Sequence, residues 1–81
     1  MKKINRLEEV FTERGIYNRT IAQYLRVSES TVSRWVHNKQ QPDLHKLYLI
    51  AEYLRVDIRD LLFPSDWTES KAMTFEKSNN S

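Results

Sequence analysis

Apolar residues recur at intervals of three and four along the first 63 positions, which is the spacing of one buried helix face. The pattern predicts five helices, over residues 2–14, 18–25, 28–37, 44–54 and 58–63. The inward faces expected on the first four consist of Ile4, Leu7, Val10, Phe11, Ile21, Ala22, Leu25, Val32, Trp35, Leu44, Leu47, Ile50, Ala51 and Leu54. We therefore expect an all-α fold, a compact five-helix bundle, within residues 1–64.

Two five-residue stretches repeat one pattern at the helix boundaries. Residues 24–28 read Tyr-Leu-Arg-Val-Ser, and residues 53–57 read Tyr-Leu-Arg-Val-Asp. We interpret each as a helix end, a one-residue corner and the N-cap of the next helix. Gly15 suits the end of the first helix because glycine adopts the left-handed conformation freely. Asp43 is the expected cap of the fourth helix, and Pro64 ends the fifth.

The segment after Pro64 differs in composition from the rest. Residues 65–81 are polar, and their only large apolar side chains are Trp67, Met73 and Phe75. Too few apolar residues are present to offset the entropy of ordering such a segment. We expect a largely disordered tail following a single domain.

Composition narrows the possible functions. The 81 residues contain no cysteine, so disulfides, thiolate metal sites and cysteine nucleophiles are excluded. His37 and His45 stand alone without ligand partners at metal spacing, and no nucleophile–base pair or glycine-rich phosphate loop is present. We expect no cofactor, no metal and no enzymatic activity. No apolar run approaches the ~20 residues of a membrane span, and the N-terminus lacks a signal peptide's apolar centre, so a cytoplasmic location is expected.

Positive charge is concentrated in the middle of the chain. The formal net charge is +2. Residues 14–41 carry five Lys or Arg against Glu29 alone, whereas residues 42–63 carry three basic and four acidic residues. A polyanionic partner would therefore meet the middle third.

An ordered series of motifs begins in this middle third and continues to residue 62. Residues 18–25 and 28–37 are joined by only a few residues, which forces the steep crossing of a helix-turn-helix. The motifs are Ile21-Ala22, Leu25-Arg26-Val27-Ser28, Thr31-Val32-Ser33, Asn38-Lys39-Gln40-Gln41-Pro42, Ile50-Ala51-Glu52-Tyr53-Leu54 and Val56-Asp57-Ile58-Arg59-Asp60-Leu61-Leu62. Over residues 4–63 this series resembles the phage repressor and Cro family of helix-turn-helix proteins, the Xre family. The resemblance implies a lambda-repressor-like fold that binds double-stranded DNA.

Two positions depart from the family pattern. Arg26 stands where the family usually has glycine, and a non-glycine residue in the left-handed corner costs about 1 kcal/mol. Tyr17 replaces the small polar residue usual at the start of the second helix, which leaves that helix without a good side-chain cap.

The resemblance implies which residues meet DNA. A helix fits the major groove, so the exposed side chains of residues 28–37 would face base edges; these are Glu29, Ser30, Thr31, Ser33 and Arg34. Arg34 can donate two hydrogen bonds to guanine O6 and N7. Asn18 matches the family's phosphate-clamping position at a helix start. Further phosphate contacts are expected from Tyr17, Arg19, His37, Asn38, Lys39 and Gln40.

A homodimer is also implied, because a single helix reads too few bases for useful selectivity. The expected dimer surface consists of Leu61, Leu62, Phe63 and Trp67. Leu61 and Leu62 are equally well explained as core residues. Trp67 could pack against its own domain instead of a partner.

Several charged residues also have readings that involve no DNA. The helix dipole would stabilise the Glu29 carboxylate at the start of the helix without any base contact, and this carboxylate would repel phosphates. Arg34 could pair with a nearby carboxylate. Arg26 and Arg55 are expected to be solvated, as are Lys2, Lys3 and Arg6, for which arm contacts to DNA are the alternative.

The sequence thus predicts a sequence-specific regulator of transcription, bacterial or phage, with repression as the simplest output and a location on the nucleoid when bound to DNA. One alternative keeps the fold but makes the chain an antitoxin, whose tail binds a toxin through Trp67, Met73 and Phe75. A second alternative is a protein-interaction adaptor that has lost DNA binding, as the low net charge and Glu29 would allow.

Overall fold

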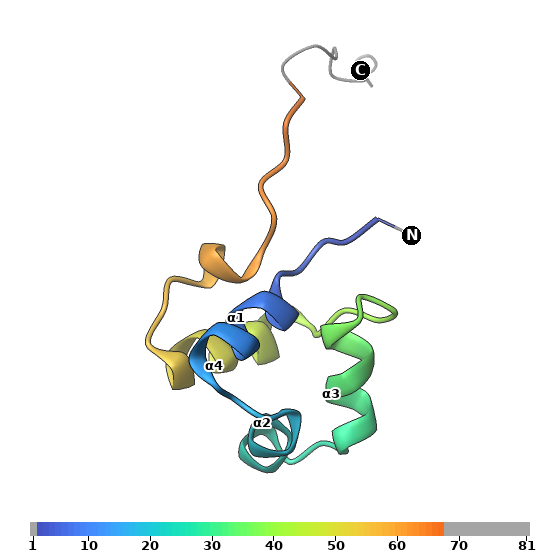
Figure 1. Ribbon diagram of the computed structural model, residues 1–81, viewed down its shortest axis with the longest axis vertical. Helices are drawn as coiled ribbons and strands as arrows, with labels where there is room; N and C mark the ends of the chain where they lie inside the picture. Colours follow the sequence, from blue (N-terminus) through green and yellow to red (C-terminus); the bar gives the residue numbers. More distant parts are fainter. Residues whose placement is uncertain (1, 68–81) are drawn as a thin grey trace, which may run out of the picture.

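Within the described residues, the fold consists of four α-helices and one short 3-10 helix. A computed structural model describes residues 2–67. Its elements are α1 (Leu7–Arg14), α2 (Asn18–Leu25), α3 (Glu29–Val36), α4 (Leu44–Leu54) and the 3-10 helix η1 (Ile58–Leu61). Helix α3 lies along one side of the domain, α2 crosses at its lower end, and α1 and α4 lie opposite (Figure 1). The prediction of an all-α fold is confirmed for this part of the chain.

The helix boundaries agree with the predicted caps. Gly15 ends α1 in the left-handed conformation, with φ 68°. The side chain of Ser28 accepts from the Thr31 N–H at the start of α3, and that of Asp43 accepts from the Lys46 N–H at the start of α4. Tyr17 provides no side-chain cap to α2, as its residue type predicts.

The first helix begins later than predicted, at Leu7 instead of about residue 2. The preceding backbone is bonded to distant parts of the chain: the N–H groups of Ile4 and Asn5 donate to the Asn38 side chain at 2.8 and 2.9 Å. The Ile4 carbonyl accepts from the Phe63 N–H at 2.9 Å. In a helix that began at residue 2 the Ile4 carbonyl would accept from the Glu8 N–H. It accepts from Phe63 instead, and Asn5 pairs with Leu62, so the helix begins only at Leu7. Ile4 is 53% exposed and does not belong to the core, contrary to expectation.

The predicted fifth helix over residues 58–63 begins where expected but is shorter, and it is not an α-helix, so the prediction of a five-helix bundle is corrected to four α-helices and a 3-10 helix in the described part of the chain. Only Ile58–Leu61 is helical, and it is a 3-10 helix. Leu62 is already extended and forms an isolated antiparallel bridge with Asn5. Phe63 precedes Pro64, which disfavours a helical conformation at Phe63. The end of the domain therefore turns back along the N-terminal segment.

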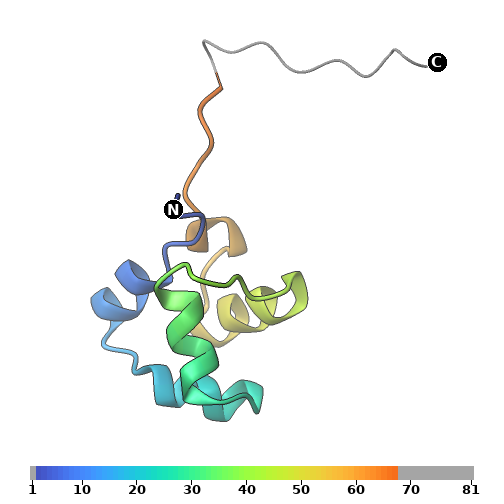
Figure 2. The same cartoon turned by 90° about the vertical axis from the view of Figure 1, so that its right-hand side faces the viewer.

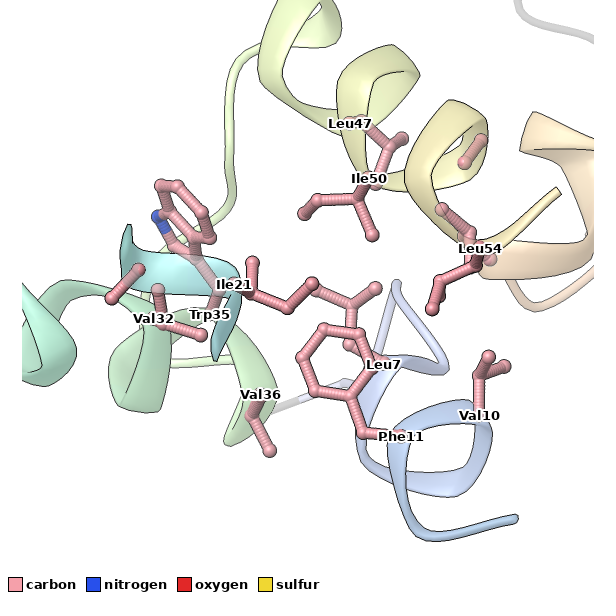
Figure 3. Packing of buried hydrophobic residues seen from close by; sticks show 13 residues of the cluster. Leu7, Val10, Phe11, Ile21, Val32, Trp35, Val36, Leu47, Ile50 and Leu54 are labelled. Atoms are coloured by element: carbon pink, nitrogen blue, oxygen red, sulfur yellow. The ribbon is translucent and has the colours of Figure 1, made fainter. Parts of the chain in front are cut away.

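The core lies where all four α-helices and η1 meet (Figure 3). Its buried apolar residues are Leu7, Val10, Phe11, Ile21, Ala22, Val32, Trp35, Val36, Leu47, Ile50, Ala51, Leu54 and Leu61. Leu25 packs against this cluster while partly exposed. Leu44 was expected in the core, but it is 74% exposed because it is the first residue of α4 and its side chain lies beyond the packed region. Leu44 instead lines a shallow apolar hollow with Ile4, Pro42 and Leu62.

The expected disordered tail and the apolar residues Met73 and Phe75 lie outside the described residues, apart from residues 65–67, which are exposed and have no regular secondary structure. No helix within residues 2–67 is long and apolar enough to cross a membrane.

Candidate nucleic-acid interface

Helix α3 has one apolar face and one polar face. Val32, Trp35 and Val36 point into the core, with exposures of 0%, 3% and 6%. The predicted base-reading residues take the other positions: Glu29, Ser30 and Arg34 are exposed, and Thr31 and Ser33 are half-buried. The outer side of the helix faces the viewer in Figure 2, with no other helix in front of it. The local sequence therefore places the five side chains of this set on one accessible surface.

The guanidinium of Arg34 is held by two neighbouring side chains. Its Nε donates to the Gln40 Oε1 at 3.0 Å, and its Nη2 donates to the Thr31 Oγ1 at 3.2 Å. Within the described residues the partners of Arg34 are thus an amide and a hydroxyl, not the carboxylate that its alternative reading required. The Gln40 contact could not be foreseen from spacing, since Gln40 lies beyond the helix end.

The start of α2 approaches the start of α3. Tyr17, Asn18, Arg19 and Glu29 line one shallow depression there, together with Ile16. Tyr17 is 69% exposed, and the Arg19 guanidinium lies 5.8 Å from the centre of its ring. Three predicted phosphate-contacting residues thus gather beside a predicted base-contacting residue. A helix start without a side-chain cap presents N–H groups that suit an anion.

The loop after α3 contains the other predicted phosphate contacts, and one of them is buried. His37, Lys39 and Gln40 are exposed, whereas Asn38 is 4% exposed. Asn38 adopts the left-handed conformation, with φ 57°. Its Nδ2 donates to the Asn5 carbonyl at 3.0 Å. The Asn38 side chain is therefore not on the surface with the others.

The buried Asn5 and the exposed Gln41 complete this amide network. The Asn5 Nδ2 donates to the Trp35 carbonyl and to the Gln41 Oε1, both at 2.8 Å, and its Oδ1 accepts from the Leu7 N–H at 3.0 Å. Buried polar groups are expected to find such partners. Sequence reasoning missed the network. The one local signal was an asparagine just past a helix end, a position that often requires the left-handed conformation.

The predicted dimer residues divide into three kinds. Leu61 is fully buried, which agrees with the alternative prediction that it packs in the core. Leu62 and Phe63 are half-buried. Trp67 is 68% exposed, with the Lys2 Nζ 5.8 Å from its ring centre. Trp67 is therefore on the surface, not packed in the core.

The electrostatic interactions that shift pKa values lie on another part of the domain. The Arg59 side chain, hydrogen-bonded to Asp57, lowers the pKa of that carboxyl from 3.8 to about 2. The backbone and side chain of Lys46 lower the pKa of Asp43. Both carboxylates are caps: the capping N–H is the largest cause of the Asp43 shift, whereas at Asp57 it comes second to the hydrogen bond from the Arg59 side chain. Among residues 2–67 no group of three His, Cys, Asp or Glu side chains is arranged to hold a metal ion.

These features define a class: a small all-α domain with two short helices joined by a tight corner, the second of which exposes a polar face. A family model described as helix-turn-helix matches residues 7–61. The chain belongs to this family, of the phage repressor and Cro (Xre) type.

Solved structures of similar fold agree with this assignment. One is a protein of Bacteroides fragilis named as a candidate DNA-binding protein, with 42% identity, 76% of this chain and 100% of that chain covered, and a TM-score of 0.73. Another is a transcriptional regulator from Listeria innocua, with 29% identity, 78% of this chain and 61% of that chain covered, and a TM-score of 0.65. No curated protein sequence matches the chain.

Proposed function

We propose that this protein is a non-enzymatic regulator of transcription that binds double-stranded DNA and reads its sequence with α3. The proposal rests above all on the two faces of α3, because the buried face fixes the helix in the domain while the polar face is left accessible. An α-helix is about 10–12 Å across, which fits the major groove of B-DNA. Similarity to a candidate DNA-binding protein and to a transcriptional regulator supports the same function.

Arg34 is the residue assigned to the main base contact, with guanine O6 and N7 as acceptors. Glu29 can accept from cytosine N4, whereas the hydroxyls of Ser30 and Ser33 are less selective. The methyl group of Thr31 can touch thymine.

Phosphate contacts are assigned to both sides of this surface. Tyr17, Asn18 and Arg19 lie at the start of α2, and His37 and Lys39 lie beyond the end of α3. Two sets on either side of the reading helix would fix its position along the groove.

The protein would act as a homodimer on a roughly palindromic site, since two half-sites about 34 Å apart double the number of base contacts. Leu62, Phe63 and Trp67 are the members of the predicted dimer surface that retain exposed area. Repression, by blocking polymerase in the cytoplasm, is the output that such binding produces most directly.

Binding titrations with two variants test the function. Affinity should fall steeply with salt, as phosphate contacts require. Arg34→Ala should weaken binding to the preferred sequence by ~1–3 kcal/mol and relax selectivity, whereas Asn18→Ala should weaken binding to all sequences about equally. Arg55→Ala is the matched control for loss of one positive charge, because Arg55 lies at the far end of α4. An unchanged site preference in Arg34→Ala would show that the assignment of the reading face, with Arg34 as its main base contact, is wrong.

A further inference from the structure

The two hydrogen bonds of Arg34 divide its guanidinium into a used edge and an unused edge. A guanidinium carries five N–H donors in one plane. The bonds to Gln40 and Thr31 engage Nε and Nη2, the two nitrogens of one side. The three donors that these bonds do not engage belong to Nη1 and Nη2, at the end of the side chain. This end edge presents two parallel N–H groups, which is the arrangement that bidentate recognition requires.

Gln40 is itself fixed relative to Arg34 through the backbone. The N–H groups of Lys39 and Gln40 donate to the Arg34 carbonyl at 2.9 and 3.3 Å. Gln40 therefore contacts Arg34 at both its main chain and its side chain.

The amide network of Asn5, Asn38 and Gln41 fixes the same loop on its inner side. Asn38 bonds the N-terminal segment through the Ile4 and Asn5 N–H groups, and Gln41 donates to the Asn38 Oδ1 at 3.2 Å. Gln40 stands between these two anchored residues. Its position next to Arg34 is thus determined by the fold and not only by a contact between two exposed side chains.

We propose that Gln40 is a specificity-determining positioning residue, which holds Arg34 with its end edge toward guanine, and that Thr31 assists through its hydroxyl. The inference rests on the proposed function and refines it. It replaces the expected phosphate contact of Gln40 with a bond to the reading side chain. Pre-orienting Arg34 reduces the side-chain entropy lost on binding, and only a base that accepts both end-edge donors benefits in full.

Selection of sites from a random double-stranded DNA library tests the proposal with the full chain. The wild type should select a guanine at one position of each half-site, and Arg34→Ala should lose that preference. Gln40→Ala should lower the preference for that guanine about three- to tenfold and leave the other positions unchanged. Its affinity for non-specific DNA should stay the same.

Two further variants separate orientation from other effects. Gln40→Glu keeps an acceptor for the Arg34 Nε, so it should retain the guanine preference while its added negative charge weakens binding to all sequences. Gln23→Ala removes an exposed amide from α2 and should leave the selected site unchanged.

The outcomes distinguish this proposal from the function on which it rests. A uniform loss of affinity in Gln40→Ala, with the guanine preference intact, would assign Gln40 to a phosphate and overturn the proposal alone. If the wild type itself selects no sequence, the proposed function and this inference both fail.

Discussion

The chain builds the same corner twice and continues from it in two different ways. Arg26 has φ 59° and ψ 44°, and Arg55 has φ 59° and ψ 46°. The following valine bonds back identically in both: Val27 to the Ala22 carbonyl and Val56 to the Ala51 carbonyl, each at 3.0 Å. The tyrosines that begin the two repeats meet, since the ring centres of Tyr24 and Tyr53 are 4.8 Å apart.

The helices that follow the two corners differ in length, in the spacing of their caps and in the number of side chains they bury. After the first corner, the Ser28 side chain bonds the Thr31 N–H, and the eight-residue α3 begins. After the second, the Asp57 side chain bonds the Arg59 N–H, one residue nearer, and only the four-residue η1 forms. Helix α3 buries three apolar side chains at helical spacing, whereas η1 buries Leu61 alone.

This difference separates two kinds of information in the sequence. The repeated Tyr-Leu-Arg-Val pattern and its cap determine the corner. The residues downstream determine whether a helix continues, because a helix in a protein is stabilised mainly by packing its apolar face. One corner thereby directs a polar helix face outward, and the other closes the domain against its N-terminal segment.

The largest expected effect concerns the single buried side chain of η1. Leu61→Ala should lower the free energy of unfolding by ~2–5 kcal/mol, because it opens a cavity where the second corner closes the core. Urea denaturation measures this change. Leu62→Ala, at a half-buried neighbour, should have a clearly smaller effect. Equal losses in the two variants would mean that η1 does not close the core through Leu61.

A smaller effect is expected from the cap of α3. Ser28→Ala should lower the free energy of unfolding by about 1 kcal/mol and should also weaken DNA binding, because the first turn of α3 carries Glu29 and Ser30. Asp57→Ala is the matched variant at the second corner, and it should destabilise the fold while leaving DNA affinity unchanged below the melting temperature. Equal weakening of DNA binding by both variants would contradict the separation of roles.

The two corner arginines should respond alike. Glycine removes a left-handed backbone strain of about 1–2 kcal/mol from the folded state. It also gives the unfolded chain more conformational freedom, which lowers the free energy of unfolding by about 0.4–1 kcal/mol. Arg26→Gly and Arg55→Gly should therefore each stabilise the fold by roughly 0.5–1 kcal/mol, measured by thermal unfolding. Opposite signs at the two corners would show that their equivalence is only geometric.

The smallest effect concerns pH and occurs only at the second corner. The pKa of Asp57 is lowered to about 2 in the folded state, chiefly by the Arg59 side chain. Its contribution to stability is therefore complete above pH 3.8 and is lost as the pH falls through 2. Unfolding curves of the wild type and Asp57→Asn should converge over this range. A constant difference between them would exclude this titration, and Ser28 provides no counterpart at the first corner.

The parts of the fold that local signals determine could be predicted from the sequence. The bounds of α2, the Ser28 and Asp43 caps, and the left-handed corner at Arg26 all depend on neighbouring residues, and all are confirmed. The start of α1 and the end of η1 could not be predicted. They depend on the pairing of Asn5 with Leu62, which lies near the opposite end of the domain.

The candidate site divides in the same way. The inward positions of Val32 and Trp35 follow from helical spacing, which leaves the polar residues of α3 outside. The burial of Asn38 and the contact of Gln40 with Arg34 depend on how the loop returns to the domain. The types of the polar residues in this loop do not reveal which of them is buried or which contacts Arg34.

Whether α3 reads DNA sequence can be measured by letting the purified protein capture fragmented DNA from the source genome at near-physiological salt and sequencing the captured fragments. We expect enrichment of an inverted repeat whose half-sites lie about 34 Å apart. Enrichment upstream of the protein's own gene would further indicate autoregulation. If protein shown to be folded enriches no sequence, α3 does not read DNA sequence.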